Sequence, residues 1–256
     1  MAIDKRPLTA RSVIASTLLG TEPPSMSAGA LVRVGEIFGI SEGTVRVALS
    51  RMAASGELEH GEGHYRLGPQ LAARQRRLSV GRNPPLVEWD GSWETAVVTG
   101  PGRSPELRTT FRTTMGRLGL AELREGVWMR PANLDPGREG WDRSEVSGSV
   151  HRFVSRPGPR TDGRSLAAEL WDLEGWAADA RTLEHELETL TDALVGEANV
   201  LRPGFETSAA VLRQLVTDPV LPTELQPAGW PAASLRQAYE VFDSAYRRSL
   251  AVWLAR

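Results

Sequence analysis

The apolar positions near the N-terminus predict three short helices. Thr9, Ser27 and Ser41 each precede a run in which apolar residues recur every three or four positions, the spacing of a buried helix face. Each of these side chains can cap the helix that follows it. Gly20 and Gly39 come directly after the first two runs, where a glycine ends a helix without strain.

A β-hairpin is predicted after the third helix. Short extended runs flank Gly61-Glu62-Gly63, and glycine at such a point favours a tight turn between two strands. The third helix itself has a buried stripe at Val45, Ala48, Leu49 and Met52. Three helices and a hairpin in this order predict a winged helix-turn-helix over residues 9–68.

The middle of the chain predicts a small α+β domain. Alternating or short apolar runs predict strands over residues 93–100, 120–123, 127–130 and 150–155. An amphipathic helix is expected over 104–118, whereas residues 132–147 show no convincing period. This order predicts a ferredoxin-like (Cas2-like) sandwich whose second helix is weak or missing.

The last part of the chain predicts a helical domain. Helical spacing starts at Ser165 and continues as one long helix to Leu194, and Pro203 interrupts the pattern. A further helix is expected over about 206–217, and Pro231 can start the last one. The class is therefore α+β, with a DNA-binding domain at 1–82, a central domain at 86–158 and a helical C-terminal domain at 162–256. A connector over 69–92 begins with a short basic helix.

The composition indicates a cellular compartment and shows an uneven distribution of charge along the chain. The chain has no cysteine, which excludes disulfides and thiolate metal sites, and no apolar run long enough to cross a membrane. A cytoplasmic protein is expected. Residues 1–82 carry 11 basic and 7 acidic side chains, although the whole chain has a net charge of -2. A basic segment on an acidic body indicates an anionic partner at that end.

The third helix is the strongest candidate for DNA contact. Burying its apolar stripe turns the opposite face outward, where Arg46 can bond a guanine, Val47 can touch a thymine methyl and Arg51 can reach a phosphate. An ordinary three-helix bundle with solvated arginines fits the helical pattern alone about as well. The predicted DNA-binding residues are Ser41, Thr44, Arg46, Val47, Ser50, Arg51, His64 and Arg66.

Residues 9–67 resemble the N-terminal domain of the PaaX-like family, the phenylacetate-catabolon repressors. The resemblance rests on T-A-R-S-V-I-A-S-T-L-L-G, G-I-S-E-G-T-V-R-V-A-L-S-R-M and Y-R-L. It continues through W-D-G-S-W and G-V-W-M-R-P in the central part, and through L-W-D-L-E-G-W and D-P-V-L-P-T-E-L-Q-P-A-G-W-P in the C-terminal part. It therefore covers nearly the whole chain in order.

The resemblance implies a homodimeric regulator, usually a repressor, that an acyl-CoA thioester such as phenylacetyl-CoA releases from an inverted-repeat DNA operator. Arginines for phosphates and tryptophans for apolar groups are expected in the C-terminal half, at Trp171, Arg202, Arg213, Trp230 and Arg247. The chain departs from the family in its wing, H-G-E-G-H, which lacks the usual basic residues. It also departs in residues 132–147, which are short for the family's second central helix.

No enzyme, cofactor or metal site is predicted. His60, His64 and Glu62 form an incomplete set of zinc ligands on the hairpin. The alternative function is a Cas2-like metal-dependent nuclease with a winged-helix targeting domain, in which Asp90 is the one acidic residue placed like a catalytic carboxylate. A winged helix used for protein contacts is a third possibility.

Overall fold

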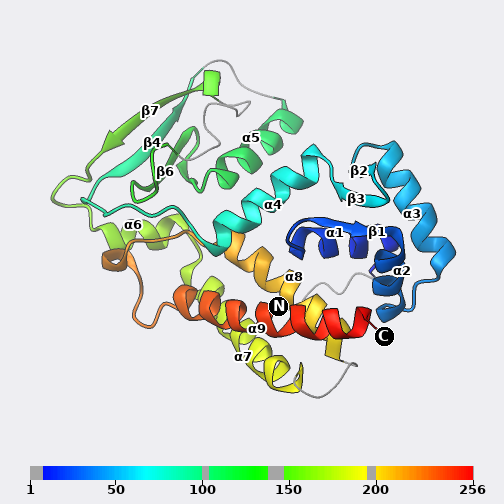
Figure 1. The fold of residues 1–256 in the computed structure, drawn as a ribbon. Coiled ribbons are helices and arrows are strands. Elements are labelled where there is room, and N and C mark those ends of the chain that lie inside the picture. Colours follow the sequence, from blue (N-terminus) through cyan, green and yellow to red (C-terminus); the bar gives the residue numbers. More distant parts are fainter. Residues whose placement is uncertain (1–7, 100–103, 138–146, 195–199, 256) are drawn as a thin grey trace. The chain divides into compact units, whose positions relative to one another are not determined.

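The computed structural model describes residues 8–99, 104–137, 147–194 and 200–255. Its elements mix helices and sheets (Figure 1), and the chain divides into two compact units. Unit 1 contains Met1–Arg82, Asp179–Val216 and Ala233–Arg256, and unit 2 contains Asn83–Ala178 and Thr217–Ala232. The segment 162–256 is thus divided between both units, and the three-domain division of the sequence stays a prediction.

Unit 1 begins with the three expected helices, α1 (Ala10–Gly20), α2 (Ala28–Ile37) and α3 (Glu42–Ala54). All three predicted caps are confirmed. The hydroxyl groups of Thr9, Ser27 and Ser41 accept hydrogen bonds from the backbone amides three residues further on, at distances of 3.2–3.3 Å. These bonds satisfy amides that have no partner within the helix.

The core of this segment joins α1, α2 and α3. Ile14 and Leu18 of α1 pack with Val45 and Leu49 of α3, and each of the four is at most 1% exposed. Gly35 of α2 lies so close to α3 that a Cβ atom there would be 2.6 Å from Cγ2 of Val45. A side chain at this position would push the two helices apart.

A three-stranded antiparallel sheet follows, with the order β1-β3-β2. The expected hairpin is formed by β2 (Leu58–Gly61) and β3 (His64–Leu67). Glu62 and Gly63 at its tip both have positive φ, as a two-residue type I′ turn requires. The short strand β1 (Ser25–Ser27), which pairs with β3, was not predicted, because three residues are too few to show alternation.

The remaining helices of unit 1 are α4 (Pro69–Arg82), α8 (Leu201–Val216) and α9 (Ala232–Leu254), with most of α7 (Leu173–Leu194). The helix α4 packs against α8, and a Cβ at Gly81 would lie 3.2 Å from the backbone of Leu215. Arg82, at the end of α4, binds Glu240 of α9 through three hydrogen bonds of 2.8–3.0 Å. Segments distant in sequence therefore build one unit.

Unit 2 contains a four-stranded antiparallel sheet with the order β5-β6-β4-β7. Its strands are β4 (Trp93–Val98), β5 (Ala121–Arg124), β6 (Val127–Pro131) and β7 (Val150–Ser155). The helix α5 (Pro105–Arg117) connects β4 and β5 and contributes Phe111 and Met115 to a core with Ala96 and Trp128. A 3-10 helix, η1 (Ser147–Ser149), precedes β7. Residues 138–146 of the segment without a period lie outside the described residues.

A second core of unit 2 joins Trp93 and Met129 to α6 (Gly163–Leu170) and to the 3-10 helix η3 (Thr223–Leu225). Arg130 is buried beside it and donates to Asn133 Oδ1 at 3.2 Å. The amide of Asn133 in turn donates to the carbonyl of Val220 at 2.8 Å. This network ties the late segment 217–232 to the sheet of unit 2.

Two expectations about the C-terminal helices were wrong. The long helix from Ser165 is broken at Trp171, whose backbone is extended, and Asp172 starts α7 by accepting a 2.9 Å hydrogen bond from the amide of Gly175. Pro203 does not interrupt a helix but lies in the first turn of α8, where its missing N–H is not needed. Among the described residues, no helix is both long enough and apolar enough to cross a membrane.

We predict that Gly35→Ala lowers the free energy of unfolding by about 1–3 kcal/mol, because the new methyl group overlaps Val45. Gly29→Ala on the same helix is the matched control, since a Cβ there meets nothing within 4 Å. That change should be neutral or stabilising by up to about 1 kcal/mol. Urea unfolding of both variants measures the difference. Equal stabilities would contradict the close approach of α2 and α3.

Candidate functional site

The outward face of α3 carries the residues predicted to contact DNA. Val45, Leu49 and Met52 are buried, and Thr44, Arg46, Ser50 and Arg51 on other sides of the helix are exposed, as are Ser41 and Val47. The side chain of Val47 is exposed although it is apolar, with 51% of its surface accessible. The structure thus gathers six of the eight predicted residues on one helix and its cap.

The arginine expected to read a base is held by a neighbour. Nε of Arg46 donates to Oε1 of Glu42 at 2.6 Å, and both side chains are more than half exposed. At the helix start, the hydroxyl groups of Ser41 and Thr44 lie 2.9 Å apart. Sequence reasoning did not foresee the Glu42–Arg46 pair, although its spacing of four residues on a helix could have indicated it.

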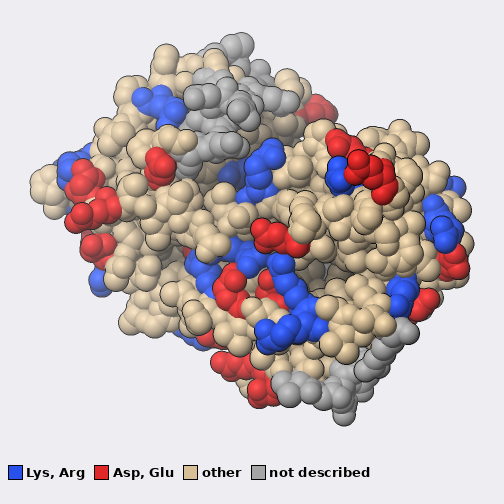
Figure 2. All heavy atoms as spheres, viewed as in Figure 1, with Lys and Arg blue, Asp and Glu red and all other residues tan. Residues whose placement is uncertain are grey.

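The tip of the β2–β3 hairpin is not a basic surface. Arg66 lies 3.7 Å from Glu62, and Nδ1 of His64 lies 3.1 Å from the carbonyl oxygen of Glu62. The ring of His60 packs on Tyr65, with centroids 4.5 Å apart. Figure 2 shows acidic side chains gathered over the region of this hairpin. Within the residues described, no group of three or more potential metal ligands is found.

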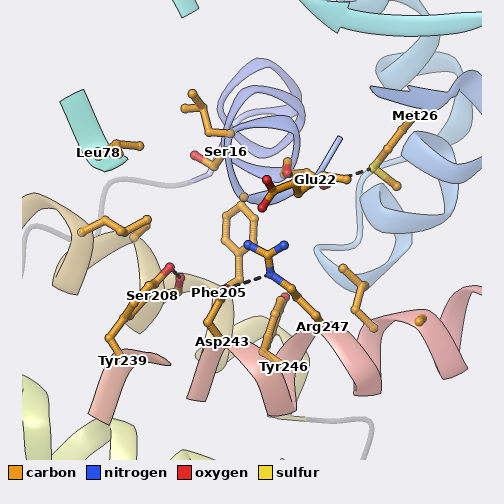
Figure 3. A pocket seen from close by; sticks show the side chains of 18 of the residues that line it. Ser16, Glu22, Met26, Leu78, Phe205, Ser208, Tyr239, Asp243, Tyr246 and Arg247 are labelled. Atoms are coloured by element: carbon orange, nitrogen blue, oxygen red, sulfur yellow. Dashed lines mark hydrogen bonds and ion pairs between the residues drawn. The ribbon is translucent and has the colours of Figure 1, made fainter. Parts of the chain in front are cut away.

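A cavity of about 340 Å³ lies within unit 1, between α1, α4, α8 and α9 (Figure 3). Leu78, Phe205 and other apolar side chains form most of its wall. Arg247 points from α9 into the cavity (Figure 3), and its Nε donates to Oδ2 of Asp243 at 2.9 Å. Arg82 lies 3.7 Å from the same carboxylate. Two arginines therefore surround one half-buried acid.

Burial changes the acidity of the groups in the cavity wall. It raises the pKa of the Asp243 carboxyl above its ordinary value, against the opposite effect of Arg247 and Arg82. It raises the pKa of Tyr239 to about 12. The hydroxyl group of Tyr239 lies 3.2 Å from that of Ser208, so the two hydroxyl groups share a hydrogen bond.

The five predicted effector residues do not form one site. Arg213 and Arg247 line the cavity. Trp171 and Trp230 pack with the second core of unit 2, where Trp230 also stacks on Trp176. Arg202 lies on the first turn of α8 and binds Glu206 at 3.1 Å.

The carboxylate of Asp90 is engaged by its own neighbours. It accepts a 2.9 Å hydrogen bond from the amide of Ser92 and a 2.6 Å bond from Arg156. Hydrogen bonds from Ser92, the largest cause, and the charge of Arg156 lower its pKa. These contacts give Asp90 a structural role at the start of β4.

We predict that Tyr239→Phe flattens the loss of stability at high pH. The neutral phenol is favoured by burial, so its contribution is complete below pH 10 and is lost as pH rises from 10 to 12. The variant should remove about 1–2 kcal/mol of the decrease in unfolding free energy over that range. Urea unfolding at a series of pH values tests this. An unchanged pH slope would contradict the burial of the phenol.

Comparisons with known proteins agree with these features. Residues 9–71 match the family model of the PaaX-like protein, and residues 86–167 match that of the PaaX protein central Cas2-like domain. Among solved structures, the uncharacterized protein Rv0674 from Mycobacterium tuberculosis is similar, with 39% identity and a TM-score of 0.75. The match covers 96% of this chain and 98% of that one. A search of curated proteins gives no significant match. The resemblance inferred from sequence is confirmed: the chain belongs to the PaaX-like family, whose members are generally transcriptional repressors.

Proposed function

We propose that this protein is a DNA-binding transcriptional repressor whose reading element is α3. The observation that carries the proposal is the exposed face of α3, on which basic, hydroxyl and apolar side chains stand together above a buried stripe. A helix of this kind fits the major groove, and the adjoining hairpin would serve as the wing of a winged helix-turn-helix. Val47, at 51% exposure, adds an apolar group to the polar side chains of this face.

Five exposed residues of α3 receive roles in DNA binding. Arg46 donates two hydrogen bonds to a guanine, and Val47 contacts a thymine methyl group. Thr44 and Ser50 bond bases or phosphates, and Arg51, one turn later, binds a phosphate. Phosphate contacts hold the protein on any duplex, whereas base contacts select a sequence.

The hairpin is assigned the weaker contact. His64 and Arg66 are exposed and can reach phosphates, but Glu59 and Glu62 on the same hairpin repel the phosphate groups. Arg66 must also leave Glu62, 3.7 Å away, before it can bind a phosphate.

The remaining parts of the proposal rest on the family. The protein acts in the cytoplasm as a homodimer that binds an inverted-repeat operator, and its central domain is ferredoxin-like. A small-molecule effector releases it from DNA by favouring an arrangement that no longer matches the operator. An acyl-CoA thioester such as phenylacetyl-CoA is the effector class that the family suggests.

We assign no catalytic role to the chain. Asp90, the acid placed like a nuclease carboxylate, is occupied by Ser92 and Arg156. Incubating the protein with labelled nucleic acid and Mg²⁺ or Mn²⁺ distinguishes the two functions, because a nuclease would cleave and a repressor would not.

Two substitutions on α3 test the division between base and phosphate contacts. We expect Arg46→Ala to weaken binding to a selected operator by about 1–3 kcal/mol and to leave binding to random duplex nearly unchanged. Arg51→Ala, on the same helix, should weaken both by similar factors. Fluorescence anisotropy at one fixed salt concentration measures both. If Arg46→Ala weakens both duplexes equally, Arg46 does not read a base.

The Glu42–Arg46 pair gives a second test. We expect Glu42→Gln to strengthen DNA binding about two- to fivefold, because it removes a negative charge from the reading face and frees Arg46. Glu36→Gln is the matched control, because it removes one negative charge at an exposed position of α2, outside that face. It should change DNA affinity less. Weaker binding by Glu42→Gln would show that Glu42 holds Arg46 in its binding orientation.

A further inference from the structure

The cavity of unit 1 is large enough for a small molecule. Its volume, about 340 Å³, lies at the lower end of the range typical of ligand sites, roughly 300–1,000 Å³. Apolar side chains from four helices form most of its wall, among them Leu19, Leu78, Phe205, Leu212 and Leu250. A whole acyl-CoA, with its nucleotide and phosphate groups, exceeds this space. The wall and the volume suit a compact, mainly apolar body.

One polar group in the wall has no partner. Thr17 of α1 lines the cavity and is 6% exposed, and its hydroxyl oxygen is buried without a hydrogen bond to any described residue. An unsatisfied buried hydroxyl destabilises a folded protein, and most such groups in proteins are bonded. The oxygen has almost no accessible surface, so the Thr17 side chain must first turn about its Cα–Cβ bond toward the cavity; a ligand that carries one hydrogen-bonding group would then satisfy it.

The charges around the cavity favour an uncharged ligand. Asp243 and Arg247, the half-buried ionic pair, bind each other at 2.9 Å, and Arg82 adds a second positive charge near the acid. The other ionic side chains of the wall, at Glu22, Arg74 and Arg213, are exposed to water. A charged ligand inside the cavity would lose its hydration, and the half-buried charged side chains of the wall are already paired with each other. The free energy lost in this way exceeds the gain from burying the apolar part of the ligand.

The cavity also touches the elements that hold α3. Thr17 lies on α1 between Ile14 and Leu18, which pack against the buried stripe of α3. Met26, on the strand that pairs with the hairpin, belongs to the same wall. Arg33 of α2 donates to the carbonyl of Trp253 at 2.9 Å, so α9 contacts α2 as well. A ligand here therefore bears directly on the position of the reading helix.

We infer that this cavity binds a compact, uncharged, mainly apolar molecule with one hydrogen-bonding group, and that its occupancy changes DNA affinity. The coupling to DNA rests on the proposed function, whereas the binding itself does not. The hydroxyl group of Thr17, turned toward the cavity, bonds the polar group of the ligand, and the leucines and Phe205 surround its apolar body.

Calorimetric titration of the full chain with naphthaleneethanol and naphthaleneacetate tests the ligand class, because the two share an apolar body and differ in charge. We expect the alcohol to bind at least about tenfold more tightly. Equal or tighter binding of the acetate would overturn the assignment of an uncharged ligand. Failure of both to bind would overturn the site.

Two variants locate the binding in the cavity. Thr17→Val keeps the shape but removes the hydroxyl group, so it should weaken the alcohol about three- to tenfold. Without ligand, Thr17→Val should have a melting temperature no lower than that of the wild type, because it removes an unsatisfied hydroxyl group.

Ala209→Trp fills the cavity and should abolish binding. The matched controls, Thr189→Val and Ser244→Trp, lie at exposed positions outside the cavity and should bind as the wild type does. Alcohol binding unchanged in both cavity variants would exclude this site.

The effect of the ligand on DNA binding is measured separately. Saturating naphthaleneethanol should change the affinity of the wild type for a selected duplex at least about threefold and leave the Ala209→Trp variant unaffected. An unchanged affinity of the wild type would overturn the regulatory role. If the protein binds the alcohol but selects no DNA sequence, the cavity stands and the proposed function fails.

Discussion

The packing of α3 against α1 and α2 determines which side chains of α3 face outward. Val45 and Leu49 are buried on Ile14 and Leu18, and the missing side chain at Gly35 lets α2 approach within contact distance of Val45. Once that stripe is buried, helical geometry leaves no freedom in which side chains face outward. Every role proposed for the exposed face, and every effect of a ligand on it, acts through this contact.

The unit that contains α3 is assembled from distant parts of the chain. Glu240 of α9 binds Arg82 at the end of α4, and Gly81 lets α4 approach α8 closely. The cavity forms where these helices meet α1, so a molecule inside it would contact both the late helices and the support of α3. A ligand effect needs no long pathway in such an arrangement, because α1 both lines the cavity and packs against α3. The proposed coupling is therefore a change in the packing of α1.

Much of the first 70 residues could be predicted from the sequence, because its signals are local. Cap residues such as Ser41 and the turn at Gly63 act within a few positions, and the structure contains each. The break at Asp172 was missed because the apolar spacing continues across it, although an aspartate can cap a helix there. The five residues predicted to bind an effector lie apart in the structure. Arg213 and Arg247 lie in the cavity wall, but Trp230 packs elsewhere, because which distant helices meet is a tertiary property that spacing does not encode.

The role proposed for α3 is to read DNA sequence. Its most direct test is a selection of duplexes from a random library with the full protein, followed by measurement of the affinity for the selected duplex and for a scrambled one at the same salt concentration. We expect the selected duplex to bind at least about a thousandfold more tightly, as specific binders generally do. Equal affinity for the two duplexes would contradict it, because phosphate contacts alone bind every sequence alike.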